Sequence, residues 1–277
     1  MELTDIGANL THDSFDADRD AVIERALAAG VSRMVVTGAD PVHSRRAIEL
    51  AAARPGVLFA TTGVHPHHAA EFDAATEREL DELLARPGIV AAGECGLDYF
   101  RDFSPRPAQR DAFRAQVRLA IAHGLPLFLH QREAHDDFLA VLDEFGTDLP
   151  PAVVHCFTGR GGELDAYLER GYYVGITGWI CDERRGRHLL EHVGRIPRGR
   201  LMLETDAPYL LPRDLSPRPR TRRNEPMWLP HIAAVVARAR GEDAGDLAAH
   251  THAAAGEFFR LPEYAAGSRA GAGRHGG

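Results

Sequence analysis

Four short apolar runs in this sequence end abruptly in a residue that can bind a metal ion. The runs are Val90 to Glu94, Leu125 to His130, Pro151 to His155 and Leu201 to Asp206. A charge or an imidazole is unfavourable in the body of a buried strand, but parallel sheets place their ligand sites at the carboxyl ends of their strands. We therefore expect a parallel sheet in which Glu94, His130, His155 and Asp206 converge on one metal ion.

The alternation of strand-like and helix-like segments predicts the type of sheet. Eight short β-rich runs are separated by amphipathic segments in which apolar residues recur at intervals of three and four. Eight alternations favour an α/β fold with a closed TIM (β/α)8 barrel, and a doubly wound open sheet is the main alternative. The eight runs are Leu3 to Asn9, Arg33 to Thr37, Leu58 to Val64, Ile89 to Glu94, Pro126 to His130, Ala152 to His155, Tyr172 to Thr177 and Leu201 to Asp206. The helical segments include Asp18 to Ala29, Thr76 to Ala85, Gln109 to His123, Glu163 to Arg170 and Leu229 to Arg240.

A single domain is expected to span residues 1–264, because α/β barrels commonly use a chain of 277 residues undivided. Gly30, Gly124 and Gly171 each follow a helical segment and precede a strand, where a left-handed residue often ends a helix. Residues 265–277 are mostly small, and we expect them to form a disordered tail.

Composition limits the classes of function. The net charge of −8 argues against indiscriminate binding to nucleic acid, although it leaves room for a local basic groove. Cys95, Cys156 and Cys181 form no C-x-x-C pair, so we expect free thiols rather than disulfides or a thiolate zinc site. The sequence has no apolar run of membrane-spanning length and no secretory leader, so we expect a cytoplasmic protein with no membrane partner.

The four polar strand ends fall on the fourth, fifth, sixth and eighth runs, whose carboxyl ends face one mouth of a barrel. Side chains alternate between the two faces of a strand, so the same register that points the metal-binding residues into the mouth sends Cys95 and Cys156 toward the helices. We therefore interpret both cysteines as packing residues.

Two imidazoles and two carboxylates form a donor set suited to Zn²⁺, Mn²⁺ or Fe²⁺, and less naturally to Mg²⁺, which prefers oxygen. An ion held there would activate a water and polarise the phosphoryl or carbonyl oxygen under attack. Asp206 is placed to take the proton of that water. Glu204, two residues earlier on the same face, is expected to ligate the ion or to orient a ligand.

Histidines other than these two are expected to play smaller roles. His65 and His67, at the end of the third run, are the exceptions, and the position of His65 is equally compatible with contacting a substrate phosphate and with bracing the mouth. Most of the others are expected on polar helix faces or in the tail and to be inert; they include His43, His123, His188, His192, His250 and His275.

Arginines cluster directly after Asp206. A charge run of this kind is often only a solvated loop, but its position beside the eighth strand end, with Arg132 on a neighbouring one, also suits a rim that binds phosphates. The loop arginines are Arg213, Arg218, Arg220, Arg222 and Arg223, and we select Arg132, Arg213, Arg222 and Arg223 as substrate-binding residues. Tyr99, Phe100, Trp179 and Tyr209 offer stacking faces for single-stranded bases. No phosphate-cradling glycine loop is present, so a nucleotide-fuelled reaction is not expected.

These segments, taken together and in order, resemble the TatD family of metal-dependent deoxyribonucleases over nearly the whole chain. The matching segments are Asp5-Ile-Gly-Ala-Asn-Leu-Thr11, Gly63-Val-His-Pro-His67, Gly93-Glu-Cys-Gly-Leu-Asp98, His130 with Arg132, His155-Cys-Phe-Thr-Gly159, Gly175-Ile-Thr-Gly-Trp179, Cys181-Asp-Glu-Arg-Arg185, Glu204-Thr-Asp-Ala-Pro-Tyr-Leu210 and Arg223-Asn-Glu-Pro226.

The resemblance implies a TIM barrel of the metal-dependent hydrolase type and 3′ to 5′ exonuclease activity on the ends of single-stranded DNA, and also RNA. It implies Mg²⁺ as activator, Glu94, His130 and His155 as ligands, and Asp206 as ligand or base. The wider family commonly carries a His-x-His pair where this chain, like the TatD branch, has Gly7 and Asn9, so we expect one well-ordered ion and any other to bind weakly.

The same resemblance suggests a role in DNA repair, and we expect a monomer. Two other functions stay open from the sequence. The metal cluster would also serve ester or amide hydrolysis, such as deacylation of D-aminoacyl-tRNA, and a non-catalytic protein quality-control factor is the alternative outside enzymes. A scaffold gives no reason to place four costly polar groups at strand ends, which argues against the second.

Overall fold

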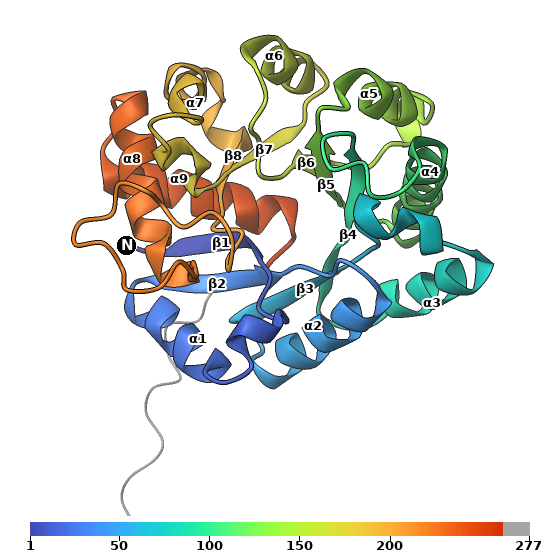
Figure 1. The fold of residues 1–277 in the computed structure, drawn as a ribbon, viewed down its shortest axis with the longest axis horizontal. Coiled ribbons are helices and arrows are strands. Elements are labelled where there is room, and N and C mark those ends of the chain that lie inside the picture. Colours follow the sequence, from blue (N-terminus) through green and yellow to red (C-terminus); the bar gives the residue numbers. More distant parts are fainter. Residues whose placement is uncertain (263–277) are drawn as a thin grey trace, which may run out of the picture.

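The computed structural model describes residues 1–262, and its centre is a closed barrel of eight parallel strands (Figure 1). Each strand pairs with the next in chain order. The ring closes where Ala8 pairs with Ala207 and the Asp206 N–H donates to the Gly7 carbonyl at 2.8 Å. The strands are β1 (Leu3–Ala8), β2 (Val31–Val36), β3 (Leu58–Thr62), β4 (Ile89–Asp98), β5 (Leu127–Arg132), β6 (Ala152–Val154), β7 (Tyr173–Ile176) and β8 (Leu201–Leu203). The TIM barrel is therefore confirmed, and the doubly wound open sheet is excluded.

Helices surround the barrel and cover the outer face of the sheet (Figure 1). Their apolar faces and the outward side chains of the strands form the larger of two buried clusters, which includes Val36, Cys95, Leu129 and Val174. The helices are α1 (Arg19–Ala28), α2 (Pro41–Ala53), α3 (Ala74–Leu84), α4 (Arg106–His123), α5 (His135–Asp143), α6 (Gly161–Glu169), α7 (Arg187–His192), α8 (Leu229–Arg240) and α9 (Ala244–Phe258). The helical segments expected from the sequence begin and end within three residues of these bounds.

A second, smaller cluster fills the inside of the barrel. Ile6, Val35, Phe128 and Met202 come from strands around the ring and pack with Phe258 of α9. Helix α9 packs against β1 and β8. Its apolar face closes the end of the barrel that lies opposite the carboxyl ends of the strands. The interior is thus a packed core, and the polar groups are left at the open mouth.

Four strands end at other residues than expected, in a way that matters for the site. β4 and β5 continue past Glu94 and His130, to Asp98 and Arg132, whereas β6 and β8 stop before His155 and Asp206. The first two side chains are therefore fixed within the hydrogen-bonded sheet, and the other two lie in the connections that follow their strands.

Gly30, Gly124 and Gly171 all have positive φ, at 92°, 63° and 79°, which confirms their expected role at helix ends. Residues 263 and 264 of the expected domain, and the tail expected at 265–277, lie outside the described residues. Within residues 1–262, no helix is both long and apolar enough to cross a bilayer.

Candidate active site

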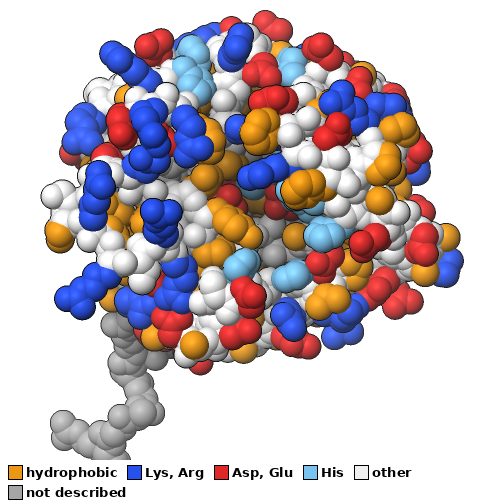
Figure 2. Space-filling view, in the orientation of Figure 1, with side chains coloured by type: hydrophobic (Ala, Val, Ile, Leu, Met, Phe, Trp, Pro, Cys, Tyr) orange, Lys and Arg blue, Asp and Glu red, His pale blue; other side chains and the backbone are white. Residues whose placement is uncertain are grey.

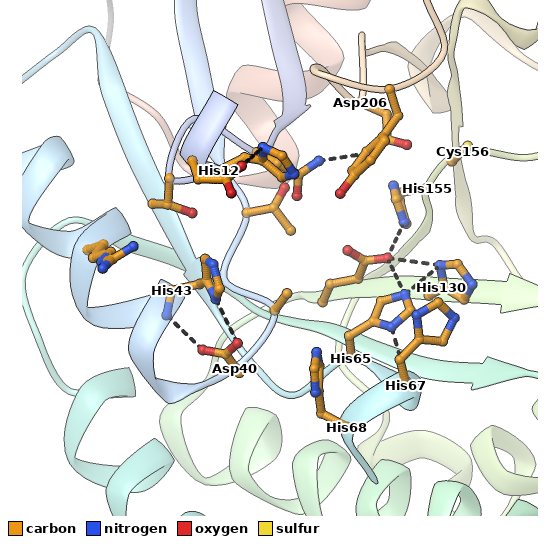
Figure 3. A pocket seen from close by; sticks show the side chains of 18 residues that line it. His12, Asp40, His43, His65, His67, His68, His130, His155, Cys156 and Asp206 are labelled. Atoms are coloured by element: carbon orange, nitrogen blue, oxygen red, sulfur yellow. Dashed lines mark hydrogen bonds and ion pairs between the residues drawn. The ribbon is translucent and has the colours of Figure 1, made fainter. Parts of the chain in front are cut away.

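Three histidines converge on one oxygen of Glu94 (Figure 3). Oε1 of Glu94 lies 2.7 Å from His155 Nε2, 2.9 Å from His130 Nδ1 and 3.3 Å from His65 Nε2. All four side chains are at least four-fifths buried. The structure therefore brings together three of the four residues at the polar strand ends, and it adds His65, for which the sequence left the role open.

The cluster is held by charge as well as by contact. Although burial opposes ionisation, His155 and His65 hold the pKa of Glu94 well below its ordinary value. Burial likewise opposes the charge on His155, but Glu94 and Glu204 raise its pKa well above the ordinary value. Burial lowers the pKa of His65 to about 4, so this imidazole is neutral at pH 7 and keeps a lone pair for a ligand.

Glycines on either side of Glu94 let β4 approach β5 closely. Gly93 and Gly96 have φ of 138° and 141°, and a Cβ on either would lie about 2 Å from the carbonyl oxygen of Phe128 or His130. The β4–β5 register shifts between Ala92 and Cys95, across Glu94 itself. This local geometry turns Glu94 into the mouth and Cys95 into the outer core, as the alternation predicted for that cysteine.

Asp98, at the end of β4, links His130 to the surrounding backbone. Its Oδ1 accepts the N–H groups of Phe100 and Arg101 at 3.0 and 2.8 Å. Its Oδ2 lies 2.7 Å from His67 Nε2 and 3.5 Å from His130 Nε2. Despite burial, hydrogen bonds from His130 and His67 lower the pKa of Asp98, so this carboxylate stays charged and orients His130 through the nitrogen that faces away from Glu94.

Glu204 lies completely buried beneath His155. Its Oε2 is 3.2 Å from His155 Nδ1, and its Oε1 accepts the N–H of Cys156. A Cβ at Gly7 or Gly175 would lie 2.5 or 2.3 Å from this carboxylate. Of the two roles expected for Glu204, these contacts support the orientation of His155. Position 7 is a glycine because the carboxylate of Glu204 fills the space that a side chain there would need.

Asp206 lies three residues past the end of β8 with a φ of 53°. Its Oδ1 accepts a hydrogen bond from Asn9 Nδ2 at 2.9 Å. Burial, with a further contribution from Glu94 and Glu204 against the opposing effect of His155, raises the pKa of Asp206 to about 7. Asp206 therefore faces the same cavity as the Glu94 cluster, but its hydrogen-bond partner is Asn9. Asn9 stands at the second of the two positions where the wider family has histidines.

The cluster lies at the bottom of a cavity of about 500 Å³ that opens at the barrel mouth (Figure 3). Its other wall is formed by residues from α2 and from the connections after β1, β2 and β3, and the sequence identified none of them as a site residue. They include His12, Asp40, His43, Arg46 and His68. Tyr209 of the 207–225 loop, which the sequence identified as a stacking residue, lines the same cavity. The signal available for them was only that polar residues follow strand ends, which does not say which connection folds over the mouth.

One expectation about this region is wrong. Cys156 is not turned toward the helices, because β6 ends at Val154 and the strand alternation no longer applies; its φ is 47° and it lines the cavity. His43 lies on helix α2, as expected, but its side chain also lines the cavity and its Nδ1 lies 2.6 Å from Asp40 Oδ2.

Arg132 lies between two aromatic rings. Its guanidinium carbon is 5.0 Å from the ring centres of both Phe100 and Trp179, and its Nη1 donates to Thr158 Oγ1 at 2.7 Å. Trp179 is also covered by Arg185 at 4.5 Å. Arg132 thus forms one layered group with Phe100 and Trp179, two of the residues predicted to stack, and cation–π contacts hold the side chains in place.

The arginines of the 207–225 loop divide into two groups. Arg213, Arg218, Arg220 and Arg222 line a second cavity of about 600 Å³ with Arg185, and basic side chains gather on that side of the mouth (Figure 2). Arg223 instead contacts the start of α1, where it pairs with Asp18 at 2.7 Å, and it also pairs with Glu225 at 2.8 Å. Its guanidinium is committed to fixing the loop against α1, so it does not join the other selected arginines.

The described donors fit a divalent cation. One donor atom each of His65, Glu94 and His130 lies within 4.8 Å of the other two, and His155 contacts the same Glu94 oxygen. Imidazoles and a carboxylate gathered this closely are the donor set of a metal site. Two of the imidazoles contact a further carboxylate that orients the ring, Glu204 for His155 and Asp98 for His130.

Comparison with known proteins gives a consistent result. The family model described as TatD related DNase matches residues 4–260. The protein described as "3'-5' ssDNA/RNA exonuclease TatD" from Erwinia tasmaniensis is 52% identical over 257 residues, which cover 93% of this chain and 99% of that protein. The protein of the same description from Shigella flexneri is 50% identical over 93% of this chain and 98% of its own length.

Solved structures agree with the sequence matches. A hydrolase TatD family protein from Entamoeba histolytica superimposes with a TM-score of 0.85 at 28% identity, covering 93% of this chain and 98% of that one. YjjV, a TatD homologue from Escherichia coli, gives the same TM-score and identity over 94% of this chain and 98% of its own.

Proposed function

This chain belongs to the family of TatD-related DNases, and from that premise we propose that it is a metal-dependent hydrolase that removes nucleotides from the 3′ end of single-stranded DNA, and also RNA. The observation that carries the proposal is the convergence of His65, His130 and His155 on Glu94 at the bottom of a cavity at the barrel mouth. The curated relatives named as 3′–5′ exonucleases are half identical to it over nearly their whole length.

We assign the ion to Glu94, His130 and His155, with His65 beside them. A divalent ion bound there would acidify a water and polarise a phosphoryl oxygen. The imidazole donors suit Mn²⁺ and Zn²⁺, whereas the family implies Mg²⁺. We therefore expect Mg²⁺ to support activity and Mn²⁺ to support at least as much.

Asp206 is the base in this proposal. Its carboxylate faces the cavity, and a pKa of about 7 places it where a base works well near neutral pH. Asn9 holds one oxygen, which leaves the other to accept the proton of the attacking water. Glu204 and Asp98 keep His155 and His130 oriented throughout.

Substrate contacts are assigned to the walls of the two cavities. Arg46, His43 and His12 line the catalytic cavity and suit the terminal phosphate. Arg132, Arg213 and Arg222 suit phosphates farther along the strand, and Tyr209, Phe100 and Trp179 suit stacking with bases of any sequence. Because the barrel interior below the cavity is packed with apolar side chains, a strand cannot thread through the barrel, which suits an enzyme that acts on strand ends.

We further propose that the enzyme works as a monomer in the cytoplasm and contributes to DNA repair and turnover. The role in repair and turnover follows from the kind of substrate, since both processes produce single-stranded ends.

Digestion of single-stranded oligonucleotides labelled at either end tests the function. With Mg²⁺ or Mn²⁺, 5′-labelled strands should shorten one nucleotide at a time, 3′-labelled strands should release labelled mononucleotide first, and chelator should abolish both. Release of an amino acid from D-aminoacyl-tRNA, with oligonucleotides left intact, would instead support ester hydrolysis.

A further inference from the structure

A second cluster of metal-binding side chains lies outside the catalytic cavity, where the 207–225 loop meets the barrel. Cys181 ends the short helix η4 (Gly178–Cys181), Asp214 lies in the loop, and His231 lies in the first turn of α8. One donor atom of each lies within 4.8 Å of the other two, and His231 Nε2 is 2.7 Å from Asp214 Oδ1. Nothing in the proposed catalysis uses these three residues.

We propose that Cys181, Asp214 and His231 bind one zinc ion that attaches the 207–225 loop to the barrel. A sulfur, an imidazole nitrogen and a carboxylate oxygen form a donor set for zinc, and Mg²⁺ has no use for the sulfur. A thiolate and a carboxylate also balance the two positive charges of the ion, so a neutral site forms at the edge of the core. The absence of a C-x-x-C pair hid this site from the sequence, because its three ligands come from three separate segments.

The surroundings of the three residues leave an ion access from solvent and room to bind. The thiol side is buried, with Cys181 only 5% exposed, while the side chains of Asp214 and His231 are 41% and 28% exposed. A cavity of about 370 Å³ borders Cys181 and Asp214 and has room for a water as fourth ligand. Arg238 and Glu183 line the same cavity with opposite charges, so together they add no net charge that would repel a cation.

The site has a consequence for the loop. Asp214 follows Arg213, and Asp182 follows Cys181. Nη1 of Arg213 lies 3.8 Å from Oδ2 of Asp182. Zinc at Asp214 would add a bond between the loop and η4 at the point where the arginines of the second cavity begin. This role is independent of the proposed exonuclease function, since it concerns the attachment of the loop whatever the substrate is.

Cobalt substitution tests the proposal without measuring activity. Thiolate bound to Co²⁺ gives a near-ultraviolet charge-transfer band, and the donors assigned to the catalytic ion contain no sulfur. Protein stripped with chelator and titrated with Co²⁺ should develop this band. Cys181→Ser should lose it, and His231→Gln and Asp214→Asn should weaken Co²⁺ binding at this site by at least tenfold.

Matched controls identify the thiol. Cys95→Ser removes a thiol that packs in the outer core, Cys156→Ser removes the thiol that lines the catalytic cavity, and Glu94→Gln disturbs the catalytic cluster. All three should keep the band. Its absence from the wild-type protein, or its survival in Cys181→Ser, would overturn the proposal and leave the three residues as a hydrogen-bonded cluster.

Thermal unfolding gives a second measurement that does not depend on the Cys181 variant folding well. In the Glu94→Gln background, zinc should raise the melting temperature by a few degrees, and adding His231→Gln should remove that gain. An equal gain with and without His231→Gln would contradict the site.

Discussion

The mouth of this barrel has two parts that are built differently. In the strand part, Glu94 and His130 lie within β4 and β5, and His155 follows β6 by one residue. In the loop part, Asp206 and the arginines lie in the long connection after β8, which is fixed by distant contacts such as Asn9 to Asp206 and Asp18 to Arg223. The difference suits the division of work that we propose, in which the strands hold the ion and the loop supplies the base and the substrate contacts.

Glu94→Gln tests the strand part and should have the largest effect. The change keeps the shape of the side chain but removes the charge on which three imidazoles converge. We expect activity to fall at least about 100-fold, because loss of even an outer partner of a metal ligand costs about 10- to 100-fold. Affinity for Mn²⁺, measured by calorimetry, should fall with it. Glu144→Gln, at an exposed carboxylate paired with Arg114, is the matched control and should leave both unchanged.

Asp206→Asn tests whether the two parts really differ. If Asp206 is the base, kcat should fall by about 10²- to 10⁴-fold while Mn²⁺ affinity changes little. A loss of affinity as large as that of Glu94→Gln would make Asp206 a ligand and would break the division.

The pH dependence of activity tests the role of Asp206 as base. In the ion-free protein the pKa of Asp206 is raised to about 7, so its carboxyl is protonated below pH 7 and charged above it. Because a base must be deprotonated before it can accept a proton, kcat should rise as pH rises through 7. Asp206→Asn should remove that part of the dependence; an unchanged profile would show that another group accepts the proton.

Arg222→Ala and Arg223→Ala sharpen the comparison within the loop, and their effects should be smaller. Arg223 fixes the loop through Asp18 and Glu225, so its loss should lower the free energy of unfolding by about 1–2 kcal/mol, with solvent screening limiting the cost. Arg222, exposed at the second cavity, should leave stability unchanged and raise KM for single strands about 2- to 5-fold, more so at low salt. The opposite pattern in melting temperature and KM would reverse the two assignments.

The strand part could be predicted from the sequence because its signal is local. An apolar run that ends in Glu94 or His130 identifies a buried strand and its direction. It also identifies the polar side chain that faces the mouth. The alternation also placed Cys95 correctly, but it was wrong for Cys156 because strand ends cannot be located to one residue.

The loop part and the outer wall could not be predicted in the same way. Arg222 and Arg223 are adjacent and identical in type. Their roles differ because only Arg223 pairs with Asp18, a residue near the start of the chain. Asn9, His43 and Arg46 likewise reach the cavity through tertiary contacts that no local pattern encodes. The function of a polar residue in a connection depends on what folds against it, which is a property of the whole chain.

The most direct test of the central claim is to locate the ion. Crystals soaked in Mn²⁺ should show an anomalous scattering peak in the catalytic cavity within coordination distance of Glu94, His130 and His155. A cavity without that peak, under conditions in which Mn²⁺ supports digestion of single-stranded DNA, would contradict the account.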